Sequence, residues 1–260
     1  MHMKSVTIVL VAIMVQSLPL ALMARVDGTG VAMSVDPEAI NIGTFYHGTT
    51  VRVAAQTPIC EGVIVTIESG EKTFILNRKA RVGFLWMNVA KVTIEGAPEV
   101  YVLASSADVE AICSAKDREK LRLGVESLKG ITSVSSDSPV TGEEFDEFIK
   151  LKRHTGEYND DITIDIESGG EEMQSVTAEL PLPSVTPSGS YKVSLYCFNG
   201  EKLVETATDE LKIEKVGLPR LEAKLAHEHA AAYGIAAILV AMVTGITMGA
   251  IFTSRGGGGH

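Results

Sequence analysis

The sequence predicts a mainly β protein: an immunoglobulin-like sandwich ectodomain of one or two β units, with a short helical insert and a single C-terminal transmembrane helix. Three observations support this prediction. Short runs rich in Val, Ile and Thr recur between Gly, Pro and Asn, which is typical of sandwich strands. Residues 107–158 change to a helical spacing of apolar side chains. Residues Ala230 to Phe252 then form an uncharged apolar run.

Residues 1–24 have the three-part pattern of a secretory signal peptide. Lys4 supplies the positive start, Val6 to Val15 form the apolar core, and the small residues Ala21 and Ala24 follow it. We expect cleavage after Ala24. An uncleaved signal anchor, which would give the chain two spans, is the alternative. In both cases the residues that follow are expected to leave the cytoplasm.

Residues 25–106 are expected to form a β-sandwich unit. Runs at Val51–Ala55, Val63–Ile67 and Thr73–Leu76 predict strands, because β-branched and aromatic side chains pack well on a pleated sheet. The segment Ser69–Lys72 separates two of these runs and contains a glycine, so it is predicted to be a hairpin connection between two neighbouring strands.

Two kinds of residue are expected in the core. Trp86 is the only tryptophan, and a core-packing role is preferred over a ligand platform because large aromatic side chains are mostly buried. The three cysteines, Cys60, Cys113 and Cys197, contain no CxxC pair for zinc or dithiol chemistry. In an oxidising compartment one pair could form a disulfide and leave one thiol over, but three buried thiols are the preferred interpretation.

Residues 107–158 are interpreted as a helical insert that covers a sheet, with a recognition surface as the alternative. A first helix is predicted from apolar positions three and four apart. These positions are Leu121, Val125 and Leu128. The Ser-rich segment 131–140 predicts a loop. A second helix is then predicted, with Thr141 as its N-cap and Glu144 at the spacing of a capping box.

Residues 159–218 are expected to form a second, immunoglobulin-like β unit. Asn199-Gly200 lies between two strand-like runs and predicts a hairpin with a type I′ turn. Tyr191 follows a Pro- and Gly-containing turn, which resembles the tyrosine corner of immunoglobulin-like sandwiches. Two residues later stands Val193 rather than cysteine, so the inter-sheet disulfide of antibody domains is not expected.

The C-terminal part of the chain predicts a juxtamembrane linker at 219–229, a transmembrane helix at 230–252 and a cytoplasmic tail at 253–260. A helix of 23 residues is about 35 Å long, enough for a hydrocarbon core of about 30 Å. Small residues recur every fourth position along the span and predict a smooth ridge on which another helix could pack. These residues are Ala237, Ala241, Gly245 and Gly249.

The charges that flank the span do not give its orientation. Arg255 favours a cytoplasmic tail, but Lys215, Arg220 and Lys224 on the other side favour the opposite. The signal sequence decides between them, because long domains translocate largely regardless of charge. We therefore expect a single-pass protein of the bacterial inner (cytoplasmic) membrane with its ectodomain in the periplasm.

The composition excludes some functions and leaves few chemical candidates. A net charge of -10 argues against nucleic-acid binding. We find no nucleophile elbow, zinc helix or phosphate-binding loop, so no catalytic residue, cofactor or metal is expected. His227 and His229 are the metal candidates, and a polar linker is the alternative. The acidic segment 160–172 lacks the regular ligand spacing of a calcium loop.

Three segments, 81–106, 180–217 and 230–252, resemble a proteobacterial family of predicted transmembrane proteins, described mainly from alphaproteobacteria. The residues that fit the family pattern are Gly83, Trp86, Asn88, Pro187, Gly189, Tyr191, Tyr233 and Gly234. The resemblance implies a topology and no catalytic residue. It also implies a transport-associated role, because genes of this family often neighbour sulfite-exporter-type permeases.

These expectations favour a non-enzymatic accessory protein. It would stand on the lipid bilayer and pack its helix on a membrane-protein partner, such as a sulfite-exporter-type permease, or on a second copy of itself. A periplasmic ligand- or metal-binding receptor is the alternative, and an enzyme of an unrecognised type is a third hypothesis.

Overall fold

The computed structural model describes residues 31–140, 142–168, 172–217 and 230–255. We call the described residues of 31–217 the β domain. The predicted signal peptide, the N-cap residue Thr141 and the predicted linker at 219–229 lie outside the described residues, as does the end of the tail.

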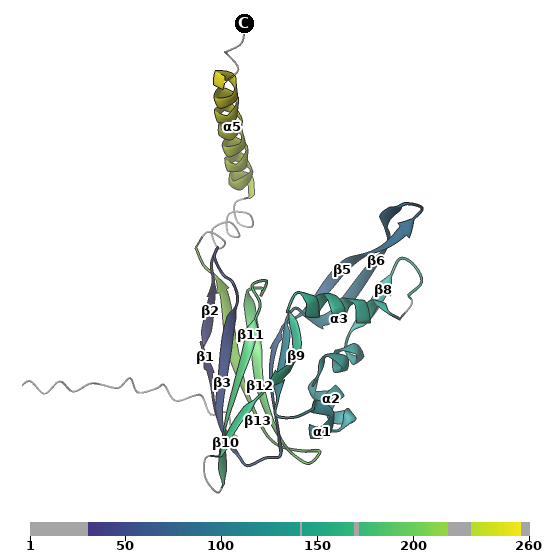
Figure 1. Cartoon of the computed structure of the whole chain (residues 1–260), viewed down its shortest axis with the longest axis vertical. Helices are drawn as coiled ribbons and strands as arrows, with labels where there is room; N and C mark the ends of the chain where they lie inside the picture. Colours follow the sequence, from purple (N-terminus) through teal and green to yellow (C-terminus); the bar gives the residue numbers. More distant parts are fainter. Residues whose placement is uncertain (1–30, 141, 169–171, 218–229, 256–260) are drawn as a thin grey trace, which may run out of the picture.

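The β domain contains three sheets (Figure 1). The first has four strands in the order β1 (Ala32–Asp36), β3 (Thr49–Pro58), β11 (Met173–Leu182) and β10 (Asp165–Ser168). The second has six strands in the order β2 (Ala39–Ile42), β13 (Lys202–Lys215), β12 (Gly189–Asn199), β4 (Gly62–Ser69), β7 (Tyr101–Ser105) and β9 (Tyr158–Thr163). The third contains β5 (Glu71–Val82), β6 (Leu85–Pro98) and β8 (Ser133–Ser136). The predicted mainly β fold is therefore confirmed.

The first two sheets face each other across one hydrophobic core. Val53 on β3 and Val176 on β11 are fully buried there, together with Val65 on β4 and Leu195 on β12. Strands from 25–106 and from 159–218 lie side by side in both sheets. The two segments therefore build one sandwich together, where the sequence had left open one or two β units.

The six-stranded sheet is covered on its other face as well. The residues of β4 are almost all buried, because Val65 points into the sandwich core while Ile64 points into a second core. This second core includes Tyr101 of β7 and apolar residues of the helical insert. The helices are α1 (Val109–Ile112), α2 (Ala115–Leu121), the 3-10 helix η1 (Val125–Gly130) and α3 (Glu144–His154). The expected helical cover of a sheet is thus present.

The first predicted helix is broken into three short ones. Cys113 is extended and ends α1, and Ser114 then caps α2 by accepting a hydrogen bond from Asp117 N–H at 3.2 Å. Arg122 ends α2 in the left-handed conformation, with φ of 58°, and Gly124 has φ of 90° before η1. Apolar spacing alone did not reveal these breaks.

Two of the predicted loops and turns were wrong. The segment 131–140 contains strand β8, which pairs with β6. Ser69–Lys72 is not a hairpin, because β4 pairs with β7 and β12 while β5 pairs with β6. The chain changes sheets at Gly70. Two consecutive apolar runs with a short turn between them do not have to pair with each other.

The β12–β13 hairpin is present, but its turn differs from the prediction. Asn199 pairs with Lys202, so Gly200 and Glu201 form the turn. Gly200 has φ of 57°, whereas the φ of Glu201 is not positive, which excludes a type I′ turn. The tyrosine-corner contact is present: the Tyr191 hydroxyl donates to the Pro187 carbonyl at 2.8 Å.

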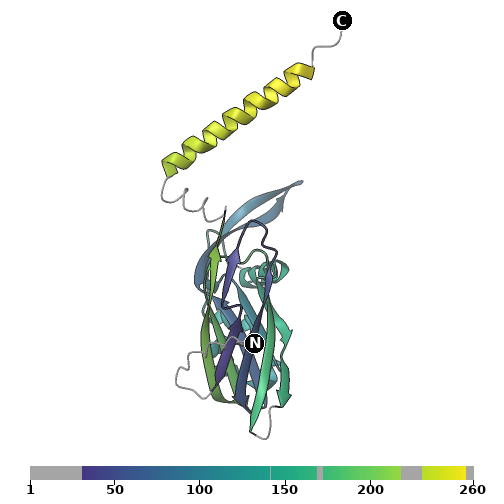
Figure 2. The ribbon, with the colours of Figure 1, turned by 90° about the vertical axis from the view of Figure 1, so that its left-hand side faces the viewer.

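The last element is α5 (Ala230–Arg255), a helix of 26 residues. Among the described residues it is the one helix long and apolar enough to cross a membrane, and none of the segment Tyr233–Ala250 is buried by the rest of the chain. Figures 1 and 2 show α5 standing apart from the β domain. The predicted span is confirmed as a candidate membrane helix.

Candidate functional site: the span and the exposed hairpin tip

The surface of α5 is apolar on all sides, which suits lipid rather than water. The small-residue ridge of Ala237, Ala241, Gly245 and Gly249 lies on it. Apart from neighbouring residues and the backbone of the helix itself, a Cβ atom added at Gly245 or Gly249 would meet nothing within 4 Å. The ridge is therefore open to contact from outside the chain.

The two threonines of the span direct their hydroxyl protons to their own helix and not to a neighbour. Thr244 Oγ1 donates to the Val240 carbonyl at 2.8 Å, and Thr247 Oγ1 donates to the Val243 carbonyl at 2.7 Å. Both hydroxyls are satisfied within their own helix, which lowers the cost of placing them in lipid.

The tip of the β5–β6 hairpin exposes a continuous group of large apolar side chains. We call residues 82–87 the hairpin tip. Every residue in it except Gly83 is a large apolar residue at least half exposed, and Phe84 and Trp86 are 84% and 72% exposed. The prediction that Trp86 packs in the core was therefore wrong.

The hairpin tip is held by regular strand pairing. Val82 pairs with Leu85 and Arg81 pairs with Trp86, so Gly83 and Phe84 form a two-residue turn. Gly83 has φ of 66°, a left-handed conformation that glycine adopts without a steric penalty. Lower on β5, Arg78 pairs with Glu144 of α3 at 3.3 Å, which ties the hairpin to the helical layer.

The hairpin rises from the end of the sandwich at which β13 finishes. Ser69, the last residue of β4, pairs with Tyr191 near the start of β12, and Gly189 pairs with Ile213 near the end of β13. In both Figure 1 and Figure 2 the hairpin points away from the sandwich at this end, from which the chain continues toward α5. Phe45, in the loop after β2, lies at this end and is 85% exposed.

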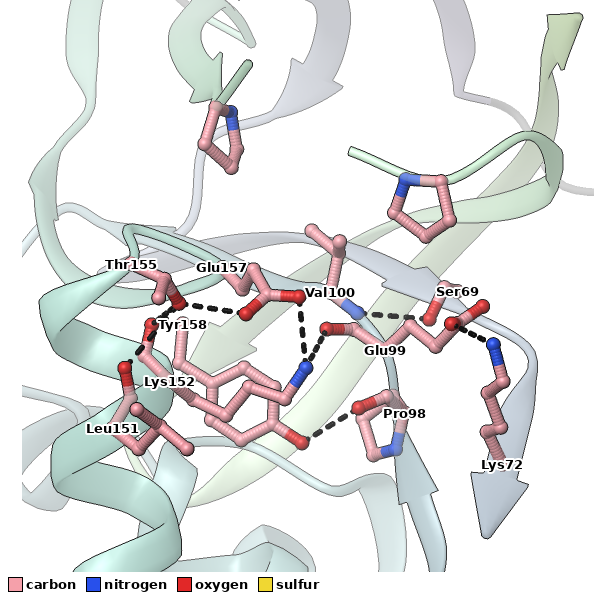
Figure 3. A network of polar contacts seen from close by, with 12 residues as sticks. Ser69, Lys72, Pro98, Glu99, Val100, Leu151, Lys152, Thr155, Glu157 and Tyr158 are labelled. Atoms are coloured by element: carbon pink, nitrogen blue, oxygen red, sulfur yellow. Dashed lines mark hydrogen bonds and ion pairs between the residues drawn. The ribbon is translucent and has the colours of Figure 1, made fainter. Parts of the chain in front are cut away.

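Behind the hairpin lies a buried polar cluster centred on Lys152 of α3 (Figure 3). The Lys152 ammonium donates to Glu157 Oε1 at 2.8 Å and to the Glu99 carbonyl at 3.0 Å. It also lies 4.4 Å from the centre of the Phe74 ring. The Tyr158 hydroxyl donates to the Pro98 carbonyl at 2.7 Å, and burial raises its pKa well above the usual range. These contacts join α3 to β6 and β9, so the cluster is structural.

A cavity of about 830 Å³ lies between the helical layer and strands β7 and β9. Some of its charged groups have ion-pair partners: Arg118 pairs with Glu110 at 2.6 Å, and Asp160 pairs with Arg153 of α3 at 2.8 Å and accepts from the Val125 N–H at 3.2 Å. The cavity contains no His or Cys side chain among its lining residues.

The structure brings no metal candidates together in the part of the chain it describes. His227 and His229 lie outside the described residues. Within 31–140, 142–168, 172–217 and 230–255, no group of three His, Cys, Asp or Glu residues could hold an ion. In the acidic segment, Asp160 and Asp161 face Arg153.

All three cysteines are buried thiols. Cys60 and Cys197 lie together in the sandwich core, where Gln174 Nε2 donates to Cys60 Sγ at 3.1 Å. A hydrogen bond from the Cys197 thiol lowers the pKa of Cys60 to about 7. Cys113 belongs to the other core, and burial raises its pKa.

Sequence reasoning missed the hairpin tip, although a signal was present. A strand with one buried face alternates apolar and polar residues, whereas the sequence from Val82 to Met87 has five large apolar residues and no polar one. Basic residues precede it. A run that is apolar on both faces, next to a turn glycine, is typical of a strand end that leaves the core.

The comparison with known protein families agrees with the presence of a membrane span. A family profile described as "Putative transmembrane protein (Alph_Pro_TM)" matches residues 30–254. The match covers all three segments on which the resemblance was based. A search among curated proteins gives no match. One solved structure, the N-terminal domain of the Streptococcus gordonii adhesin Sgo0707, is similar over 73% of this chain and 33% of that chain. The two are 10% identical, and a TM-score of 0.27 does not indicate a shared fold.

Proposed function

Because the chain belongs to the Alph_Pro_TM family of transmembrane proteins, we propose that it is a non-enzymatic accessory protein anchored in the bacterial inner membrane. Its β domain is a periplasmic ectodomain, and α5 binds a membrane-protein partner. The partner that the family resemblance favours is a transporter such as a sulfite-exporter-type permease. Self-association through the same helix is the other form of this proposal.

The observation that carries the proposal is the state of α5. A helix of 26 residues is about 39 Å long, which exceeds the hydrocarbon core of a bilayer. The β domain buries none of its central segment. A soluble protein would hide such a surface, so its exposure supports a position in lipid. The β domain itself is a closed sandwich with two complete cores.

The proposed orientation is tested by protease protection. Whole cells, spheroplasts and disrupted spheroplasts that express the full chain with a C-terminal epitope are treated with a protease. We expect cleavage of the β domain in spheroplasts and of the epitope only after disruption. Cleavage of the epitope in intact spheroplasts would contradict the orientation.

The partner is tested by detergent extraction from native membranes, purification and mass spectrometry. If the ridge forms the contact, G245L/G249L places large side chains on it and loses the co-purifying partner or the dimer. V240F/V243F adds the same number of side-chain carbons on the opposite face of α5 and serves as the matched control. A wild-type chain that is strictly monomeric and brings down no membrane protein would contradict the proposal. A permease among the co-purifying proteins would support the transport-associated form.

A further inference from the structure

The side chains of the hairpin tip belong to neither core of the β domain. Its large apolar side chains point into solvent, although the same residue types elsewhere in the domain are mostly buried in two cores. A soluble surface rarely exposes such a continuous apolar group unless it is an interaction site. The tip is also held in a paired hairpin, so little conformational freedom would be lost when it binds.

The tip is apolar on both of its faces. In a strand pair, residues directly opposite each other share a face, and successive residues alternate. Val82, Leu85 and Met87 therefore lie on one face, while Trp86 lies on the other. A groove on a protein surface covers one face of a strand pair. A lipid layer surrounds an inserted tip on all sides and so matches this pattern better.

The strands just below the tip are basic. From residue 73 to residue 94 the charged residues are Arg78, Lys79, Arg81 and Lys91, with no Asp or Glu, in a chain whose net charge is -10. Among the described residues, no carboxylate lies within 4.0 Å of the side-chain nitrogens of Lys79 or Arg81. A pair of free cations beside an apolar tip is complementary to anionic phospholipid headgroups.

The tip also lies at the end of the β domain that faces the span. The fourteen residues 216–229 that join β13 to α5 can reach at most about 50 Å. They hold this end of the domain near the bilayer that α5 crosses. Phe45 and Val185, which lie in two other loops of the same end, are exposed as well.

We infer that the hairpin tip is a second membrane contact, which binds anionic phospholipid. Phe84, Leu85 and Trp86 insert among the acyl chains next to the headgroups, and Lys79 and Arg81 bind the headgroup phosphates. The inference rests on the proposed anchoring by α5, which brings the tip to the membrane. Together the two contacts fix the tilt of the β domain above the bilayer, because the membrane then holds the domain at two separate points.

Trp86 is the only tryptophan and lies in the tip, so its fluorescence reports the contact directly. The full chain is reconstituted in vesicles of phosphatidylcholine with phosphatidylglycerol, with and without brominated acyl chains. We expect a blue-shifted emission that brominated lipid quenches and that aqueous iodide reaches poorly. F84S/L85S should lose most of the quenching. I59S is the matched control, since Ile59 (52% exposed) resembles Leu85 (54%) and lies at the opposite end of the sandwich.

Two double variants test the proposed contact between the basic residues and the headgroup phosphates. K79E/R81E should reduce quenching several-fold in vesicles with phosphatidylglycerol, while K116E/K202E, which removes the same charge elsewhere, should leave it unchanged. Flotation of the vesicles after a carbonate wash reports anchoring by α5 separately. A chain that floats but whose Trp86 stays unquenched and open to iodide would overturn the inference and leave the anchoring intact. Shielding of Trp86 only in native membranes would also overturn it, in favour of a protein partner.

Discussion

Lys152 Nζ lies 2.8 Å from Glu157 Oε1, and both side chains are largely buried between α3 and the strands behind it. The Lys152 ammonium also donates to the Glu99 carbonyl, and the Thr155 hydroxyl donates to the other oxygen of Glu157 at 2.6 Å. The ion pair therefore has the additional hydrogen bonds that buried charges require.

Removal of one partner of this pair should destabilise the β domain strongly. E157Q leaves the Lys152 ammonium buried without a counter-charge, and we expect a loss of about 3 kcal/mol in the free energy of unfolding. K152M/E157Q should lose less than the two single variants together, because it leaves no isolated charge. Denaturant unfolding of the full chain in detergent measures both.

The matched control is E147Q on the same helix. Glu147 pairs with Lys150 at 2.7 Å, but both side chains are about 70% exposed. A surface pair of this kind contributes at most about 0.5 kcal/mol. Equal effects of E157Q and E147Q would show that burial of the Lys152 pair has no energetic consequence.

The stability of the β domain should fall steeply above pH 10. Burial raises the pKa of Tyr101, Tyr158, Tyr191 and Tyr196 above the ordinary value of 10.0. A group whose pKa is raised in the folded state contributes stability that is complete below its unfolded pKa, about 10, and is lost as the pH rises above it. Phenolate absorbance and circular dichroism should therefore change together in one alkaline transition. Stepwise tyrosine ionisation in a domain that stays folded would contradict this.

Gly62, the first residue of β4, leaves no room for a side chain. A Cβ atom there would lie 2.5 Å from Ile112 Cγ2 of α1. G62A should cost about 1–3 kcal/mol of stability, because the second core would have to shift to accept the methyl group. In the double variant G62A/I112A the shorter side chain at position 112 makes space for the new methyl group. This variant should therefore recover part of the stability that G62A loses.

G70A is the control for this substitution. A Cβ atom at Gly70 would meet nothing within 4 Å, and its φ is not positive. We expect a change within about 0.5 kcal/mol. The unfolding midpoints of G62A, G62A/I112A and G70A measure these effects. A G62A chain as stable as G70A would refute the close approach of α1 to β4.

Cys60 and Cys197 should be the pair that reacts with a mild oxidant. Both lie in the sandwich core, where the Cys197 thiol is near enough to lower the pKa of Cys60, whereas Cys113 lies in the other core. With diamide the two thiols lose two protons and two electrons and form one disulfide, and the diamide takes up both. Mass spectrometry should show the loss of two hydrogens in the wild type and in C113S, but not in C197S. Loss of two thiols in C197S would indicate that Cys60 pairs with Cys113.

The sequence predicted those features that follow from periodicity. The sandwich strands, the helical insert and the span are all set by how apolar residues recur along the chain. The composition of the turn before Tyr191 resembled that of a tyrosine corner, and in the structure the Tyr191 hydroxyl donates to the Pro187 carbonyl. The helix break at Arg122 was not predicted, since a non-glycine residue gives no sign that it will adopt a positive φ.

Of the two parts of the candidate site, only the span was predicted from the sequence. A membrane span can be recognised from composition alone. The exposed position of Trp86 depends on β5 and β6 leaving the sandwich to form a separate sheet, and strand pairing between distant segments is not written in local sequence. The general preference of tryptophan for burial then gave the wrong answer.

The position of β13 next to the connection to α5 has a mechanical consequence. Any pull between membrane and β domain acts along the axis of this strand, from its end at Lys215. β13 is paired with β12 on one side from Lys202 to Ile213, and its last four residues, Lys212 to Lys215, are paired with β2 on the other. Such a load stretches these ladder bonds in parallel, by shear, and does not peel them apart one by one. The domain is thus attached to its anchor through the strand best placed to bear tension.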